Sequence, residues 1–107
     1  MTQQRRYAII FAPEVLDHLD VIERRHYRLI KQTIDEQLSY APVEETRNRK
    51  PLEQPAPFSA QWELRFGPDN RFRVFYELDL SKRVVWVLAI GVKVGNRLLV
   101  GGKEFTP

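Results

Sequence analysis

The 107-residue chain contains no cysteine, which excludes disulfide bonds and thiolate metal sites and is typical of proteins in a reducing cytoplasm. Long apolar runs are also missing, because the longest one, residues 84–92, is too short to cross a bilayer. Residues 1–7 lack the pattern of a signal peptide. We therefore expect a soluble, cytoplasmic protein with no membrane partner, and no pattern in the sequence indicates a metal or an organic cofactor.

Hydrophobic residues make up 43% of the chain, an ordinary share for a folded globular protein. A chain of this length suffices for one core, so we predict a single domain over residues 1–107. The net charge of +3 is unevenly distributed: residues 1–46 carry six Lys/Arg against eight Asp/Glu, and residues 47–103 carry eleven against five. A positive second part suits a polyanionic partner, although basic residues that only solubilise a sheet surface would give the same count.

Residues 62–76, WELRFGPDNRFRVFY, predict two β-strands joined by a turn at residues 67–70. Side chains alternate along a strand, so Arg65 and Arg73 each project away from the apolar face of their own strand. If the two apolar faces lie together, both guanidinium groups stand on the same open side of the sheet. Adjacent cations repel one another, and a phosphate between them would relieve the repulsion. The pattern therefore indicates a phosphate-bearing partner, for which we favour RNA.

The regions before the hairpin predict a strand and two helices. Residues 7–12 form a short apolar run, and two apolar stripes follow over residues 15–22 and 27–38. Pro42 disfavours a helical conformation before it, so the second helix must end near Ala41. The charged stretch of residues 23–26 separates the stripes, which favours a helical hairpin on a sheet; a single bent helix is the alternative.

Residues 41–60 contain four prolines and no periodicity, which predicts an extended surface loop. Beyond the hairpin, residues 83–92 are apolar on both faces and should form a strand in the middle of the sheet. The glycine-punctuated tail leaves room for one more short strand at residues 98–100.

This order of elements, with an arginine-rich hairpin, resembles the RelE/ParE superfamily of toxins from bacterial type II toxin–antitoxin modules. The matching residues are Leu64-Arg65 before the turn, Arg73-Val74-Phe75-Tyr76 after it, and VLAIGVK at residues 87–93. The resemblance covers residues 7–93 and implies an α+β fold. It implies an N-terminal strand and a helical hairpin packed on one face of a mostly antiparallel twisted sheet, in the order β-α-α-β-β-β. It also implies a toxin that a cognate antitoxin holds inactive.

In that superfamily, RelE-like members cut mRNA on the ribosome, whereas ParE-like members poison DNA gyrase. The resemblance implies that Arg65, Arg73 and Lys93 are catalytic residues that bind the scissile phosphate without a metal. Phe75 lies between Arg73 and Glu77 on the polar face of its strand, so we expect it to be exposed and able to stack on a nucleobase. The residues expected to contact RNA are Arg47, Arg49, Lys50, Arg71 and Phe75.

Cleavage through the ribose 2′-hydroxyl also needs groups that accept and donate a proton. Glu63 lies on the same side as Arg65 and is the acid–base candidate, although an ion pair with that arginine explains it equally. Related nucleases often place a tyrosine or histidine in the C-terminal segment, but residues 94–107 contain neither, and Leu98 and Leu99 stand there.

The two histidines of the chain, His18 and His26, precede the hairpin in sequence and are expected to be surface residues. Two interpretations of function therefore remain. The first is a RelE-like, ribosome-dependent endoribonuclease. The second is a non-catalytic interaction protein, either a gyrase poison or a degenerate toxin that only binds its antitoxin.

Overall fold

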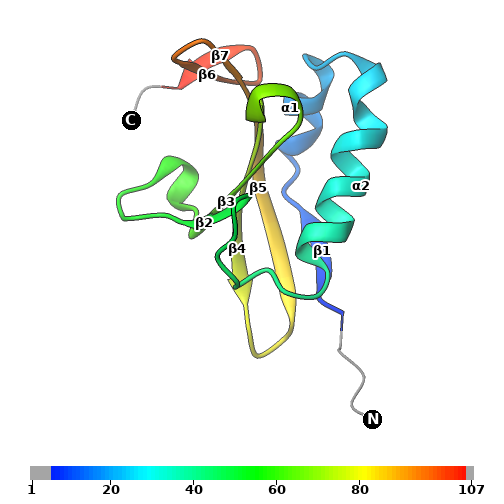
Figure 1. Ribbon diagram of the computed structural model, residues 1–107, viewed down its shortest axis with the longest axis vertical. Helices are drawn as coiled ribbons and strands as arrows, with labels where there is room; N and C mark the ends of the chain where they lie inside the picture. The colour runs from blue at the N-terminus through cyan, green and yellow to red at the C-terminus, as the bar shows by residue number, and fades with distance from the viewer. Residues whose placement is uncertain (1–5, 106–107) are drawn as a thin grey trace.

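The structure is a computed structural model that describes residues 6–105. One sheet has the strand order β2-β3-β4-β5-β6-β7, and β1 pairs with β5 in parallel; the other pairings are antiparallel. The two helices lie on one face of this sheet (Figure 1). The elements are β1 (Ala8–Phe11), α1 (Val15–Asp20), α2 (Tyr27–Leu38), β2 (Arg49–Pro51), β3 (Trp62–Phe66), β4 (Phe72–Asp79), β5 (Val84–Val94), β6 (Arg97–Val100) and β7 (Lys103–Phe105). The predicted α+β fold is confirmed.

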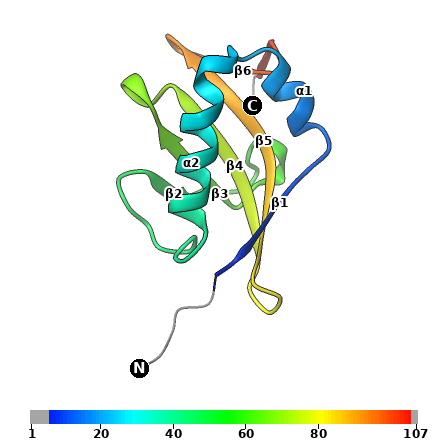
Figure 2. The same cartoon turned by 90° about the vertical axis from the view of Figure 1, so that its right-hand side faces the viewer.

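The helical hairpin has the predicted form. Pro13 and Glu14 precede α1, as is usual at a helix start, and a 3₁₀ turn, η1 (Arg24–His26), separates α1 from α2. α2 ends at Leu38, four residues before Pro42. Figure 2 shows α2 lying across the sheet with α1 beside it. The single bent helix is therefore not formed, and within residues 6–105 no helix is long and apolar enough to cross a membrane.

The main core lies between the helices and the sheet. Ile30, Ile34 and Leu38 of α2 are buried against the apolar face of the strands. Tyr76 is fully buried in this core, and its hydroxyl donates to the Pro42 carbonyl oxygen at 2.8 Å. Burial raises the pKa of Tyr76, so the hydroxyl stays a neutral donor at physiological pH. β5 is central, as predicted, because β4 flanks one side of it and β1 and β6 flank the other.

A smaller core covers part of the sheet face opposite the helices, which we call the second face. It contains Ala60, Phe75, Ala89 and Val100, packed by Leu52, Leu88, Leu98 and Phe105. Its cover comes from a 3₁₀ turn, η2 (Pro57–Ser59), and from the β6–β7 hairpin. The sequence predicted neither β7 nor β2, which lies inside the expected loop of residues 41–60. Pro51 is tolerated in β2 because an edge strand needs no amide proton on its free side.

Candidate phosphate-binding groove

Arg65 and Arg73 are directly opposed across the β3–β4 pair. Directly opposed residues of an antiparallel pair point to the same side of the sheet, so both side chains lie on the second face, as the sequence predicted. Two opposed like charges destabilise a strand pair unless an opposite charge lies near them. A carboxylate of the same chain supplies part of this opposite charge.

Glu63 is the compensating group. One carboxylate oxygen, Oε1, accepts from Arg65 Nε at 2.5 Å, and the other, Oε2, lies 3.6 Å from Arg73 Nη1. The Glu63 and Arg73 side chains are only 7% and 10% exposed, whereas that of Arg65 is 36% exposed. Burial lowers the pKa of Arg73, the Glu63 carboxylate opposes that shift, and the nearby Arg65 charge adds to it. Two cations thus share one carboxylate, and the cluster keeps a net positive charge.

The turn between β3 and β4 positions Arg73. Gly67 has φ 84°, and a Cβ on it would lie 2.6 Å from the Phe72 ring, so the turn requires glycine there. Asp69 and Asn70 adopt φ 55° and 51°, a left-handed conformation that these residue types tolerate. The Asn70 carbonyl then accepts from Arg73 Nε at 2.9 Å. This contact fixes the base of the guanidinium, so its two Nη atoms, of which Nη1 lies 3.6 Å from Glu63 Oε2, are the donors that can reach an anion.

An open groove of about 520 Å³ lies where this turn meets the end of β5. The Lys93 amide donates to the Arg71 carbonyl oxygen at 2.7 Å and joins the two segments. The groove is lined by Pro68, Asp69, Arg71, Arg73, Lys93, Val94 and Gly95. Three of the predicted cations, Arg71, Arg73 and Lys93, therefore converge, with Asp69 as the carboxylate beside them. Arg65, which lies opposite Arg73 on β3, does not line the groove.

The prediction that Phe75 is exposed is wrong. Its side chain is 1% exposed in the second-face core, and its ring centroid lies 5.8 Å from that of Phe58. In sequence, Phe75 lies between Arg73 and Glu77, and this polar pattern gave no indication that a distant segment covers it. Phe75 has no face available for a nucleobase.

Arg49 also differs from its prediction as an RNA contact. It lies opposite Leu64 in the β2–β3 pair, so its side chain turns toward the helical face and is buried. Its guanidinium donates to the Gln37 and Glu44 carbonyl oxygens and to Gln37 Oε1 at 2.7–3.0 Å. Arg49 therefore joins the end of α2 to β2. Its neighbours Arg47 and Lys50 are exposed, and Lys50 lies opposite Glu63 on the second face.

The histidines are not simple surface residues, contrary to the prediction. His26 packs on Phe72 with ring centroids 5.2 Å apart. His18 Nδ1 accepts from the Ile90 amide at 3.3 Å, at a part of β5 between its pairings with β1 and β6. No local pattern could have revealed this contact, since it joins positions 72 residues apart.

The His18 contact predicts a pH dependence of stability. Burial lowers the pKa of His18 below its ordinary 6.5, while Asp17 and then Glu14 oppose the shift. The unfolded chain therefore binds this proton more readily, so His18 makes stability fall as pH drops from about 6.5 toward the lower folded pKa. We expect the loss to be on the order of 1 kcal/mol or less, since it concerns one hydrogen bond at a partly exposed site. Urea unfolding between pH 5 and 8 should show this slope in the wild type and a shallower one in His18→Gln; equal slopes would contradict the assignment.

Residues that suit proton transfer are scarce at the groove. Its lining, which lies wholly within the described residues, contains no histidine or tyrosine. Leu98 faces Lys93 across the β5–β6 pair, and Leu99 projects to the other side of the sheet. Across residues 6–105, no three His, Asp or Glu side chains are grouped so that they could hold a metal ion.

Comparisons with known proteins agree with this geometry at the level of the fold. No family model and no curated protein matches the sequence. A solved structure that is similar is a chain of the toxin–antitoxin complex RelBE2 from Mycobacterium tuberculosis, with a TM-score of 0.69 and 19% sequence identity. The match covers 87% of this chain and 98% of that chain. The chain therefore has the fold of a component of a toxin–antitoxin complex, and the resemblance read from its sequence is confirmed as a likeness of fold.

Proposed function

We propose that this chain is the toxin of a type II toxin–antitoxin pair, a RelE-like protein of the cytoplasm that inhibits translation by cutting mRNA on the ribosome. The convergence of Arg71, Arg73 and Lys93 in one groove carries the proposal. The fold supports it, since the similar chain belongs to a structure described as a toxin–antitoxin complex. A cognate antitoxin is the implied protein partner.

The groove suits stabilisation of a phosphate in its transition state. When the ribose 2′-hydroxyl attacks the adjacent phosphorus, negative charge grows on the non-bridging oxygens. Arg73 is preorganised to meet that charge because Asn70 anchors its Nε atom. Lys93 is exposed and adds a mobile point charge. Both act without a metal ion.

Arg65 has a positioning role in this proposal. It holds Glu63 more closely than Arg73 does, with 2.5 Å against 3.6 Å between the charged atoms. By occupying that carboxylate, Arg65 leaves more of the Arg73 charge available to the phosphate. The same geometry makes Glu63 an ion-pair partner of both arginines and a poor candidate for a general base.

The second candidate function is a non-catalytic interaction protein, which poisons DNA gyrase or only binds its antitoxin. The scarcity of proton-transfer groups at the groove favours it, since Asp69 is the one carboxylate among the lining side chains, which include no histidine or tyrosine. A nuclease of this kind would depend on Asp69 or on the ribosome for that step.

One experiment separates these functions. The chain is expressed with and without a candidate antitoxin, while mRNA 5′ ends and chromosomal DNA breaks are mapped in the same cells. We expect growth arrest with new 5′ ends that lie in coding regions in phase with the codons, because cleavage occurs on the ribosome. DNA breaks without new mRNA ends would establish the gyrase alternative. Unaffected growth would establish a degenerate toxin.

A further inference from the structure

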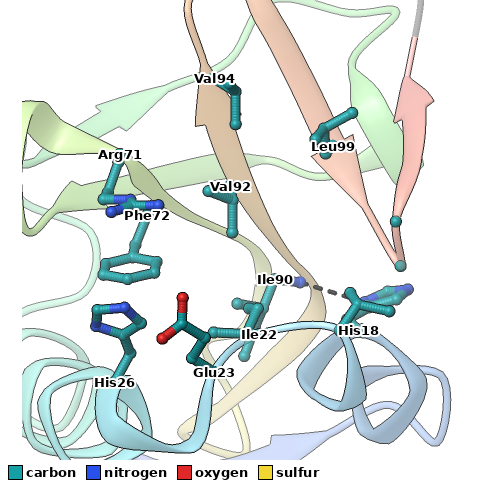
Figure 3. Close-up of a pocket in the computed structure, with 13 residues that line it drawn as sticks. His18, Ile22, Glu23, His26, Arg71, Phe72, Ile90, Val92, Val94 and Leu99 are labelled. Carbon is teal, nitrogen blue, oxygen red and sulfur yellow. Dashed lines mark hydrogen bonds between the residues drawn. The ribbon is translucent and has the colours of Figure 1, made fainter.

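A second pocket lies on the helical face of the sheet, next to the groove (Figure 3). It has a volume of about 200 Å³, room for about seven water molecules at roughly 30 Å³ each. That is below the roughly 300–1,000 Å³ of pockets for drug-sized ligands. The pocket therefore suits one small ring system. Among its lining residues are four ionisable or polar side chains, His18, Glu23, His26 and Arg71.

The walls of this pocket are apolar and aromatic. Ile22, Ile90, Val92 and Leu99 line it, and the Phe72 ring contributes to one wall, although this side chain is fully buried. His26 packs on that ring, and the Arg71 guanidinium carbon lies 5.5 Å from its centroid (Figure 3). Cation–π and ring contacts of this kind hold Arg71 and His26 at fixed positions on the wall. A flat apolar face of a ligand would fit against these side chains.

The charged groups are placed at two different points of the pocket. Figure 3 shows the Glu23 carboxylate between His26 and Ile22, while the Arg71 guanidinium lies on the far side of the Phe72 ring. Glu23 has its ion pair with Arg25, at 2.8 Å, rather than with Arg71. The Glu23 side chain is 68% exposed, so its carboxylate lies at the rim of the pocket, with one oxygen, Oε2, paired to Arg25. The pocket thus presents a carboxylate at its rim and a planar donor at another point, with apolar surface between them.

A ligand that bridges these groups needs donors on one edge and acceptors on another. Guanine has this pattern, because its N1–H and N2 amino group donate while O6 and N7 accept, and arginine pairs with O6 and N7 in a bidentate way. Adenine combines a donor and an acceptor on the same edge and matches less well. We propose that this pocket binds a guanine base of a single-stranded RNA. The inference rests on the proposed function, which supplies RNA as the partner.

The pocket and the groove are connected. Arg71 and Val94 line both of them, and the backbone bond from the Lys93 amide to the Arg71 carbonyl oxygen lies between them. An RNA phosphate held by Arg73 and Lys93 would therefore place a neighbouring base near Arg71. Unstacked bases of single-stranded RNA are recognised in this way, by their edges and by contact with aromatic side chains, and His26 is a half-buried aromatic ring of this pocket. The pocket would give the groove a base preference.

The test is an NMR titration of the folded chain with guanosine and adenosine 5′-monophosphate. We expect guanosine monophosphate to shift the amides of Ile22, Ile90 and Leu99 and to bind about tenfold more tightly than the adenosine compound. Glu23→Gln should bring the affinity ratio close to one, because the amide replaces one acceptor by a donor. Arg71→Lys should also reduce it, since lysine keeps the charge but loses the bidentate geometry.

Glu36→Gln, an exposed glutamate of α2, is the matched control and should leave the ratio unchanged. Equal affinities with shifts confined to Lys93 and Gly95 would overturn the inference, and so would a guanine preference that survives Glu23→Gln. The mapping of mRNA 5′ ends tests the proposed nuclease activity independently of this titration. A guanine preference in a chain that cuts no mRNA would uphold the pocket and reject the nuclease.

Discussion

Arg73→Ala is expected to slow mRNA cleavage by about 10²–10³-fold, which corresponds to about 2.7–4 kcal/mol of lost transition-state stabilisation. Arg73 is the groove cation that is both buried and anchored, because its Nε atom donates to the Asn70 carbonyl oxygen. Its guanidinium is therefore already oriented before the substrate binds. Arg73→Lys should recover only part of the rate, because lysine cannot keep the Asn70 contact and the fork toward the phosphate together. The measurement is the rate of appearance of new mRNA 5′ ends after induction.

Two further variants separate chemistry from folding. Lys93→Ala removes an exposed groove cation, so it should slow cleavage without lowering the melting temperature. Arg28→Ala removes an exposed arginine of α2 that does not line the groove, and should change neither. Undiminished cleavage in both Arg73→Ala and Lys93→Ala would show that the groove is not the site. Reduced cleavage in Arg28→Ala would indicate a general effect of charge.

Glu63→Gln is expected to destabilise the fold by about 3 kcal/mol, because it leaves the opposed Arg65 and Arg73 without their counter-charge. The estimate is at the low end for a broken buried pair, since the Arg65 side chain is 36% exposed and water screens part of its charge. Phosphate should restore more stability to the variant than to the wild type, because an anion that binds only the folded state stabilises it. Urea unfolding in chloride and in phosphate at equal ionic strength measures both effects.

The matched control for this variant is Glu77→Gln. Glu77 lies on the same sheet face, opposite Trp86 in the β4–β5 pair. It should change stability little, and phosphate should not distinguish it from the wild type. If phosphate stabilised Glu63→Gln no more than the wild type, the two arginines would not form an anion site.

The helical hairpin and the central strand were predictable because each depends on local periodicity. A 3.6-residue repeat placed Ile30, Ile34 and Leu38 on one stripe of α2, and the structure buries that stripe. The central place of β5 followed from its apolar character on both faces. The pairing of Arg65 with Arg73 followed from the two-residue alternation of a strand and a short turn, so one groove cation, Arg73, and its neighbour Arg65 could be placed on one side of the sheet from 15 residues of sequence.

The errors concern residues whose environment is set by segments far away in the chain. Phe75 was expected to be exposed, but η2 and the β6–β7 hairpin cover it. Arg49 was expected to contact RNA, but the three-residue strand β2 was not foreseen, and its register turns Arg49 toward α2. Neither segment has enough length or alternation to be recognised by its own pattern.

The sequence by itself determined which faces of the helices and strands are apolar and that Arg65 and Arg73 share one side of a hairpin, because both depend only on the periodicity of neighbouring residues. The tertiary structure alone decided that Arg71, Arg73 and Lys93 form one groove, that Glu63 compensates two arginines, and that His18 binds the Ile90 amide. The reason is physical. Whether a side chain is buried, and which charged side chains meet in one groove, depends on contacts between distant segments, which form only when the chain packs as a whole.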